Sequence, residues 1–116
     1  MFKFEKLAVW KKSLDFAELI YSETTSFPPE ERFGLTNQIR RAAASVPSNI
    51  AEGSARSDAD FSRFLGYASG SLYEVVTQSF IARRRKFLSD ASFERIYADA
   101  DEVSRMLSGL RGSLGD

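Results

Sequence analysis

The sequence predicts an all-α protein, an antiparallel up-down four-helix bundle that forms one domain over residues 1–116. Apolar residues recur at steps of three and four along four long segments, which is the spacing of one face of an α-helix. Only three prolines occur in 116 residues, which suits long helices with short connections better than a turn-rich β fold. The four segments cover about residues 5–25, 30–52, 57–86 and 90–111.

The first segment carries two apolar stripes. One follows helical spacing and is expected to face the core: Leu7, Trp10, Leu14, Ala17 and Tyr21. The other lies roughly 120° round the helix and consists of Val9, Phe16 and Ile20. A single bundle needs one buried seam per helix, so the second stripe is either additional core or a contact between subunits. The subunit contact is the interpretation we favour.

The second segment combines a helical apolar face with a proline. The face repeats through Leu35, Ile39, Ala42, Val46 and Ile50. Pro47 lacks a backbone donor and its ring clashes with the preceding turn, so we expect this helix to be kinked or broken near Pro47. Gly53 is expected to cap the helix C-terminus. Asn49 and Glu52 either bind a ligand or, as we favour, satisfy backbone groups that the proline frees.

The third and fourth segments each begin with a capping residue and continue with one seam. Ser57 is expected to cap the third helix, and Ser89 or Asp90 the fourth. The third seam consists of Phe61, Leu65, Ala68, Leu72, Val75 or Val76, Ser79 and Ala82. The fourth keeps a heptad through Phe93, Ile96, Ala100, Val103, Leu107, Leu110 and Leu114, as in bundle packing.

Another face of the third helix contains Gly66, Tyr73 and Phe80. Gly66 and Gly70 form a GxxxG pattern, which indicates that a neighbouring helix comes close, in the same subunit or in another one. Combined with the second stripe of the first helix, this face gives the candidate subunit contacts: Val9, Phe16, Ile20, Gly66, Tyr73 and Phe80.

Composition excludes several classes of function. The chain contains no cysteine and no histidine, so it lacks thiolate metal sites and the commonest general base. It has no phosphate-binding loop, no dinucleotide fingerprint and no Glu-x-x-His di-iron motif. We therefore expect no enzyme activity, no cofactor and no metal. Without a signal peptide or a membrane span in the sequence, the protein is expected to be soluble and cytoplasmic.

Basic residues form two candidate sites for nucleic acid. The densest is the run Arg83, Arg84, Arg85 and Lys86, which either engages phosphates or complements the dipole at a helix C-terminus. The second is Arg40, Arg41 and Arg56, which either extend that surface or pair with Glu52 and Glu74. The structural interpretation is the one we favour for each. The formal net charge is zero, with 16 basic and 16 acidic residues, which argues against binding driven by bulk charge.

The run GLTNQIRRAAASVPSNIAEG, from Gly34 to Gly53, resembles the signature of a bacterial four-helix-bundle family, the 23S rRNA intervening-sequence proteins. This S23-like family is related to the Avd-type accessory proteins of diversity-generating retroelements. The other helices match the family pattern in register at Leu7-Ala8-Val9-Trp10, Phe64-Leu65, Gly70-Ser71-Leu72 and Met106-Leu107. Lys86 departs from the pattern, because the family usually has a glycine before the third loop.

The resemblance implies a ring-like homo-oligomer, typically a homopentamer. Its retroelement relatives bind a reverse transcriptase and its RNA or DNA through a basic surface. Our leading hypothesis is therefore a non-catalytic homo-oligomeric scaffold that binds nucleic acid through Arg40, Arg41, Arg56, Arg83, Arg84, Arg85 and Lys86. The alternative is a protein–protein assembly module with no nucleic-acid role, which the balanced charge and the surplus apolar stripes favour.

Overall fold

The computed structural model describes residues 1–115, which form four long helices and two short 3₁₀ helices. The long helices are α1 (Ala8–Glu23), α2 (Leu35–Ser54), α3 (Asp58–Arg84) and α4 (Asp90–Ser113). The 3₁₀ helices are η1 (Lys3–Lys6) and η2 (Pro29–Glu31). The described residues contain no strand, so the predicted all-α class is confirmed.

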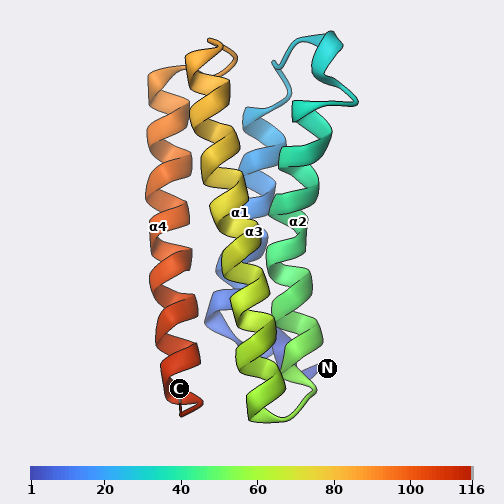
Figure 1. Cartoon of the computed structure of the whole chain (residues 1–116), viewed down its shortest axis with the longest axis vertical. Coiled ribbons are helices and arrows are strands. Elements are labelled where there is room, and N and C mark those ends of the chain that lie inside the picture. The colour runs from blue at the N-terminus through green and yellow to red at the C-terminus, as the bar shows by residue number, and fades with distance from the viewer. Residues whose placement is uncertain (116) are drawn as a thin grey trace.

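The long helices run antiparallel to their neighbours and give a molecule of 42 × 22 × 21 Å (Figure 1). Each helix packs on the next, and α4 packs back on α1, whereas α1 and α3 lie diagonally opposite. The connection between α1 and α2 and the connection between α3 and α4 lie at one end, which we call the loop end. Both chain termini and the connection between α2 and α3 lie at the other end, the termini end.

Both apolar stripes of α1 contribute to the core, and the second stripe does so more completely than the first. Val9, Phe16 and Ile20 are buried in the bundle, the last two completely. They cannot contact another subunit, so the prediction that assigned them that role was wrong. Leu14 and Tyr21, which were expected in the core, are 39% and 45% exposed. Ala17 of the same stripe is buried, and Leu7 and Trp10 are partly buried against the core, so the first stripe is divided between core and surface and the second stripe is the additional core.

Helix α2 continues through Pro47 without a break, so of the predicted kink or break the break is excluded. Two side chains supply donors to carbonyls in the turn before the proline. The Ser48 hydroxyl donates to the Ala44 carbonyl at 2.9 Å, and Asn49 Nδ2 donates to the Ser45 carbonyl at 2.9 Å. Asn49 therefore bonds to the backbone, but the Ser45 carbonyl is not the one that Pro47 leaves without its helical donor, which is the Ala43 carbonyl. Pro47 is itself buried, so tertiary packing offsets the cost of a proline in a helix.

Gly53 lies inside α2 and has no positive φ, so it is not the predicted left-handed cap. Its role is to let α2 and α3 come together. A Cβ atom added at Gly53 would lie 2.6 Å from the Phe64 Cβ and 3.0 Å from the Phe61 Cδ1. Only glycine therefore fits at this point of the α2–α3 interface without a shift of α3.

The caps and seams of α3 and α4 agree with the sequence analysis. The Ser57 hydroxyl accepts from the Asp60 N–H at 3.3 Å, and the Ser89 hydroxyl accepts from the Ser92 N–H at 3.0 Å. Between the alternatives at the α3 seam, Val75 is the fully buried residue. The α4 seam is buried from Phe93 to Leu107 and becomes half-buried at Leu110 and Leu114.

Candidate nucleic-acid interface

The structure separates the predicted basic residues between the two ends of the bundle. Arg56 follows α2 at the termini end, whereas the run 83–86 closes α3 at the loop end. Helix α3 has 27 residues, so about 40 Å separates these two groups at 1.5 Å per residue. Arg40 and Arg41 lie within the first two turns of α2, in the half that is close to the loop end. Arg56 therefore cannot share a local surface with the 83–86 run of the same chain.

Arg40 is a structural residue that closes the end of α1. Its Nε donates to the buried Thr24 hydroxyl at 2.9 Å, and its Nη2 donates to the Tyr21 carbonyl at 3.3 Å. Its guanidinium also lies over the Tyr21 ring, 5.0 Å from the centroid. A cation at the last carbonyls of a helix complements the helix dipole. Arg40 therefore stabilises the end of α1, without the glutamate partner that was expected.

Two more of the predicted arginines are engaged inside the chain. Arg56 pairs with Glu52 at 3.5 Å and lies 4.8 Å over the Phe64 ring, as the favoured structural interpretation expected for that pair. Arg83 lies 3.8 Å over the Phe93 ring and pairs with Glu94 at 3.8 Å. Both guanidinium groups stack on aromatic side chains, so they belong to the packing of the bundle.

The remaining four predicted cations are accessible: Arg41, Arg84, Arg85 and Lys86. Within residues 1–115, none of the four makes a salt bridge within 4.0 Å. Arg85 lies 5.8 Å over the Phe87 ring, which orients it at the start of the connection to α4. These four side chains therefore present unneutralised charge at or near the loop end.

The turn that carries this charge has a defined geometry. The Lys86 N–H donates to the Arg83 carbonyl at 2.9 Å, and the Phe87 N–H donates to the Ala82 carbonyl at 2.8 Å. This pair of bonds is the Schellman motif, in which glycine usually takes the left-handed position. Here Lys86 takes it, with φ 63°, and is the only non-glycine residue of the described chain with positive φ. The motif fixes Lys86 at the tip of the turn.

Two further residues at the loop end, Arg32 and Phe33, are exposed and were not among the predicted site residues. Phe33 is 85% exposed, and the Arg32 guanidinium lies 5.2 Å from its ring centroid. The predicted second helix was expected to begin near residue 30, which put both residues inside its first turns. Gly34 was the available signal, because α2 begins only after it, at Leu35. We name Arg32, Arg41, Arg84, Arg85 and Lys86 the loop-end basic surface.

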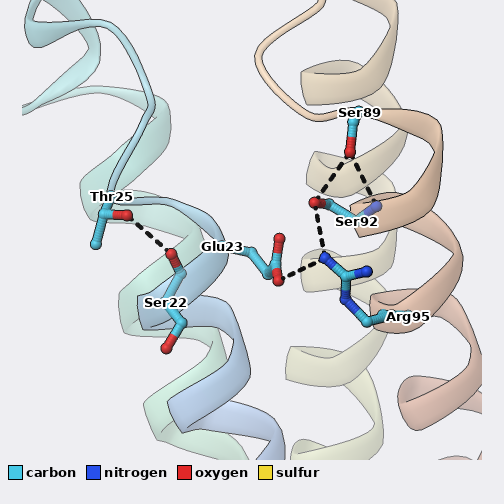
Figure 2. A network of polar contacts seen from close by, with 6 residues as sticks. All are labelled: Ser22, Glu23, Thr25, Ser89, Ser92 and Arg95. Atoms are coloured by element: carbon cyan, nitrogen blue, oxygen red, sulfur yellow. Dashed lines mark hydrogen bonds and ion pairs between the residues drawn. The ribbon is translucent and has the colours of Figure 1, made fainter.

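One acidic residue near this surface, Glu23, makes its contacts within the bundle. Figure 2 shows Glu23 of α1 reaching Arg95 of α4, with an oxygen–nitrogen distance of 3.0 Å. Arg95 also donates to the Ser92 hydroxyl, which in turn contacts the Ser89 hydroxyl (Figure 2). A hydrogen bond from Ser92 and the charge of Arg95 lower the pKa of Glu23, against the effect of burial. The network joins the end of α1 to the start of α4.

A second ion-pair group ties α1 to α4 further along the bundle. The Lys12 ammonium lies 3.6 Å from Asp99 and 3.3 Å from Glu102. Burial lowers the pKa of Lys12, but the hydrogen bonds and charges of the two carboxylates outweigh it, so the pKa is raised. Across residues 1–115 there is no group of three or more acidic, histidine or cysteine residues that could hold a metal ion.

Two apolar grooves lie on opposite sides of the bundle. One, of about 490 Å³, lies between α1 and α2 and is lined by Trp10, Leu14, Tyr21 and Pro47 among others. The other, of about 410 Å³, lies between α3 and α4 and is lined by Tyr73, Val76 and Tyr97 among others. Since α1 and α3 are diagonal in the bundle, these grooves face away from each other.

The candidate contacts on α3 have different surroundings. Tyr73 is 63% exposed in the α3–α4 groove. Phe80 is 37% exposed and forms an edge contact with Phe93, with centroids 4.8 Å apart. Gly66 is covered by the Arg111 side chain, whose Nη1 would lie 3.3 Å from an added Cβ. Tyr73 and Phe80 are therefore accessible, whereas Gly66 accommodates a side chain of α4.

No helix in the described part of the chain has the length and apolar character needed to cross a membrane.

Comparisons with known proteins place the chain among related sequences. Residues 5–109 match the family described as 23S rRNA-intervening sequence protein. The fold is similar to the crystal structure of a protein of unknown function from the S23 ribosomal protein family of Bacteroides thetaiotaomicron VPI-5482. That similarity has a TM-score of 0.80 at 27% sequence identity, and it covers 90% of this chain and 98% of the other. A search of curated proteins finds no match.

Proposed function

The chain belongs to the 23S rRNA-intervening sequence protein family, and we propose that it is a non-catalytic, homo-oligomeric scaffold that associates with nucleic acid through the loop-end basic surface. The single observation that carries the nucleic-acid role is the set of accessible cations near one end of the bundle, without ion-pair partners in residues 1–115. Arginine and lysine in this state can exchange counterions for phosphates. The protein would act in the cytoplasm.

Self-assembly is the second part of the proposal, and the two apolar grooves support it. A groove on the α1–α2 side of one subunit and a groove on the α3–α4 side of the next form a head-to-tail contact, which closes into a ring when the rotation permits. Family resemblance suggests five subunits. A ring built through the sides of the bundles would bring all loop ends to one face. Repeated basic surfaces there would raise the avidity for a long polyanion.

The test is binding of structured RNA and duplex DNA across a salt series, with the oligomeric mass recorded in the same buffers. We expect the logarithm of affinity to fall linearly with the logarithm of salt concentration. The double variant Arg84→Glu, Arg85→Glu should abolish most of the binding at unchanged mass. Arg105→Glu, on an exposed face of α4, is the matched control and should bind as the wild type does. Equal binding by all three proteins would contradict the nucleic-acid role.

The alternative function is a protein–protein assembly module without a nucleic-acid role. The observation in its favour is the exposed aromatic surface at the α3–α4 groove, where Tyr73 and Tyr97 line the groove and are 63% and 47% exposed. Phe80, which is 37% exposed, contacts the Tyr97 ring beside it. A reverse transcriptase is one partner that the family resemblance suggests. This function predicts that the ring binds no nucleic acid at low salt. It also predicts that Tyr73→Ala releases a protein that co-purifies after nuclease treatment, whereas Tyr67→Ala on a different face of α3 does not.

A further inference from the structure

We propose that the loop end recognises single-stranded nucleic acid in preference to duplex, with Phe33 as the platform on which an unpaired base stacks. The inference rests on the proposed nucleic-acid role and adds the class of ligand. Phe33 is 85% exposed and has the most accessible aromatic ring in residues 1–115. Aromatic rings stack on the faces of unpaired bases with little dependence on sequence, whereas the bases inside a duplex are already stacked.

The backbone around Phe33 is held in place. Pro28 and Pro29 limit the conformation of the chain before it, and Pro29 begins η2. After it, the Gly34 N–H donates to the Glu31 carbonyl at 2.9 Å, and the Leu35 N–H donates to the Glu31 side chain at 3.1 Å. These bonds fix the segment on both sides of the ring. Because the backbone is already fixed, less conformational freedom is lost when a base stacks on the ring than in a flexible loop.

The stacking residue lies at the same end as the phosphate-binding candidates. The two loop-end connections touch, because the Phe27 and Phe87 rings are 5.8 Å apart. Gly53 of α2 packs against Phe64 of α3, and the helices run antiparallel from that point. Leu35 lies eighteen residues before Gly53 in α2, and Ala82 lies eighteen residues after Phe64 in α3. Each of these stretches is about 27 Å long at 1.5 Å per residue. Phe33 is therefore about level with the start of the 83–86 run.

The charges fit a single strand better than a duplex. The loop-end basic surface has five cations, and Glu30 and Asp90 are exposed acids at the same end. Strong duplex binding without base contacts depends on many neutralised phosphates. Fewer phosphate contacts suffice when each stacked base adds its own free energy, as in proteins that bind single strands. Arg32 lies 5.2 Å over Phe33 and provides a cation next to the platform.

The experiment compares a 20-nucleotide oligouridylate, an oligothymidylate of the same length and a 20-base-pair duplex, by fluorescence anisotropy at one salt concentration. Phe33→Ala should weaken binding to both single strands by about 5- to 150-fold, the effect of losing one stacked base, and leave duplex binding unchanged. Phe33→Trp should keep single-strand affinity within a few-fold of wild type. Tyr67→Ala removes another exposed ring, which lies outside the grooves and far from the loop end, and is the matched control.

The outcomes separate this inference from the function on which it rests. If Phe33→Ala binds single strands like the wild type, while Arg84→Glu, Arg85→Glu abolishes binding, the stacking role is refuted and the nucleic-acid role stands. If the wild type binds neither strand type nor duplex at low salt, both are refuted. A change of oligomeric mass in Phe33→Ala would make Phe33 a subunit contact and overturn the inference. Preference for oligouridylate over oligothymidylate would identify RNA as the ligand.

Discussion

The two ends of the bundle use the same pairing of arginine with an aromatic ring to different effect. At the termini end Arg56 lies over the buried Phe64 and also pairs with Glu52. At the loop end Arg32 lies over the exposed Phe33 and has no acidic partner within residues 1–115. In the first arrangement the ring is buried and the arginine has an acidic partner. The second leaves both available to a ligand.

The two ends also differ in which residue occupies a position that suits glycine. At the termini end Gly53 stands where any side chain would collide with α3. At the loop end Lys86 takes a left-handed conformation that glycine would adopt more readily. Glycine at position 53 therefore favours stability, because it lets α2 and α3 pack closely. At position 86 a charged residue takes a conformation that costs stability.

The largest expected effect is the loss of close packing at the termini end. Gly53→Ala should lower the free energy of unfolding by about 2 kcal/mol, because the added methyl group collides with the Phe64 Cβ at 2.6 Å. Gly70→Ala is the matched control, since nothing lies within 4 Å of an added Cβ there. It should raise the free energy by about 0.5–1 kcal/mol through helix propensity. Urea denaturation measures both, and stabilisation of both variants would contradict the packing role of Gly53.

The next largest expected effect is a difference in stability between variants of the adjacent residues Arg40 and Arg41. Arg40→Ala removes hydrogen bonds to Thr24 and to the last turn of α1, so we expect a loss of about 1.5 kcal/mol in the free energy of unfolding. Arg41→Ala removes an exposed side chain and should change it by less than about 0.5 kcal/mol. Arg41→Ala should bind nucleic acid with lower affinity than Arg40→Ala does, under conditions in which Arg40→Ala is folded. The reverse ranking in stability would show that Arg40 is not the cap of α1.

Part of the fold was predictable from the sequence. The seams of α3 and α4 were identified because each helix has one dominant stripe that repeats over many turns. Helix α1 has two stripes of equal regularity, and periodicity cannot say which one faces inward. Phe16 and Ile20 proved to be core, whereas Leu14 and Tyr21 proved to be surface. Only the packing of the other three helices decides between the two.

The sequence drew attention to the basic residues, but it predicted few of their partners and did not predict their division between the two ends of the bundle. Arg40 is held by Thr24 and Tyr21, which lie 16 and 19 residues earlier in the chain. Arg95 reaches Glu23 across 72 residues. Contacts between elements that are distant in sequence depend on register, which the pattern of one helix does not contain. The same limitation applies to Gly53, whose neighbours are on another helix.

Replacing Lys86 should raise the stability of the protein and lower its affinity for nucleic acid. Lys86→Gly should raise the free energy of unfolding by about 1 kcal/mol, because glycine adopts positive φ without a Cβ clash. Lys86→Asn, which tolerates this conformation, should give a smaller gain. Both variants lose the charge and should weaken nucleic-acid binding to the same extent. Stabilisation without any loss of affinity would remove Lys86 from the loop-end basic surface.

The smallest expected effect tests the acidic side of the loop end. Glu23 has a lowered pKa, so its ionised form stabilises the fold above the ordinary glutamate pKa of 4.5, and this contribution is lost as pH falls through the folded-state pKa. Glu23→Gln should lower the free energy of unfolding by about 0.2–1 kcal/mol at pH 7, and the difference from wild type should vanish in acid. Glu18→Gln, on the exposed face of α1, is the control. A difference that persists at pH 3 would assign the effect to packing of the side chain. Disappearance of the difference would show that the charge of Glu23 stabilises the contact between α1 and α4. Glu23 is then engaged by Arg95 and does not neutralise the loop-end basic surface.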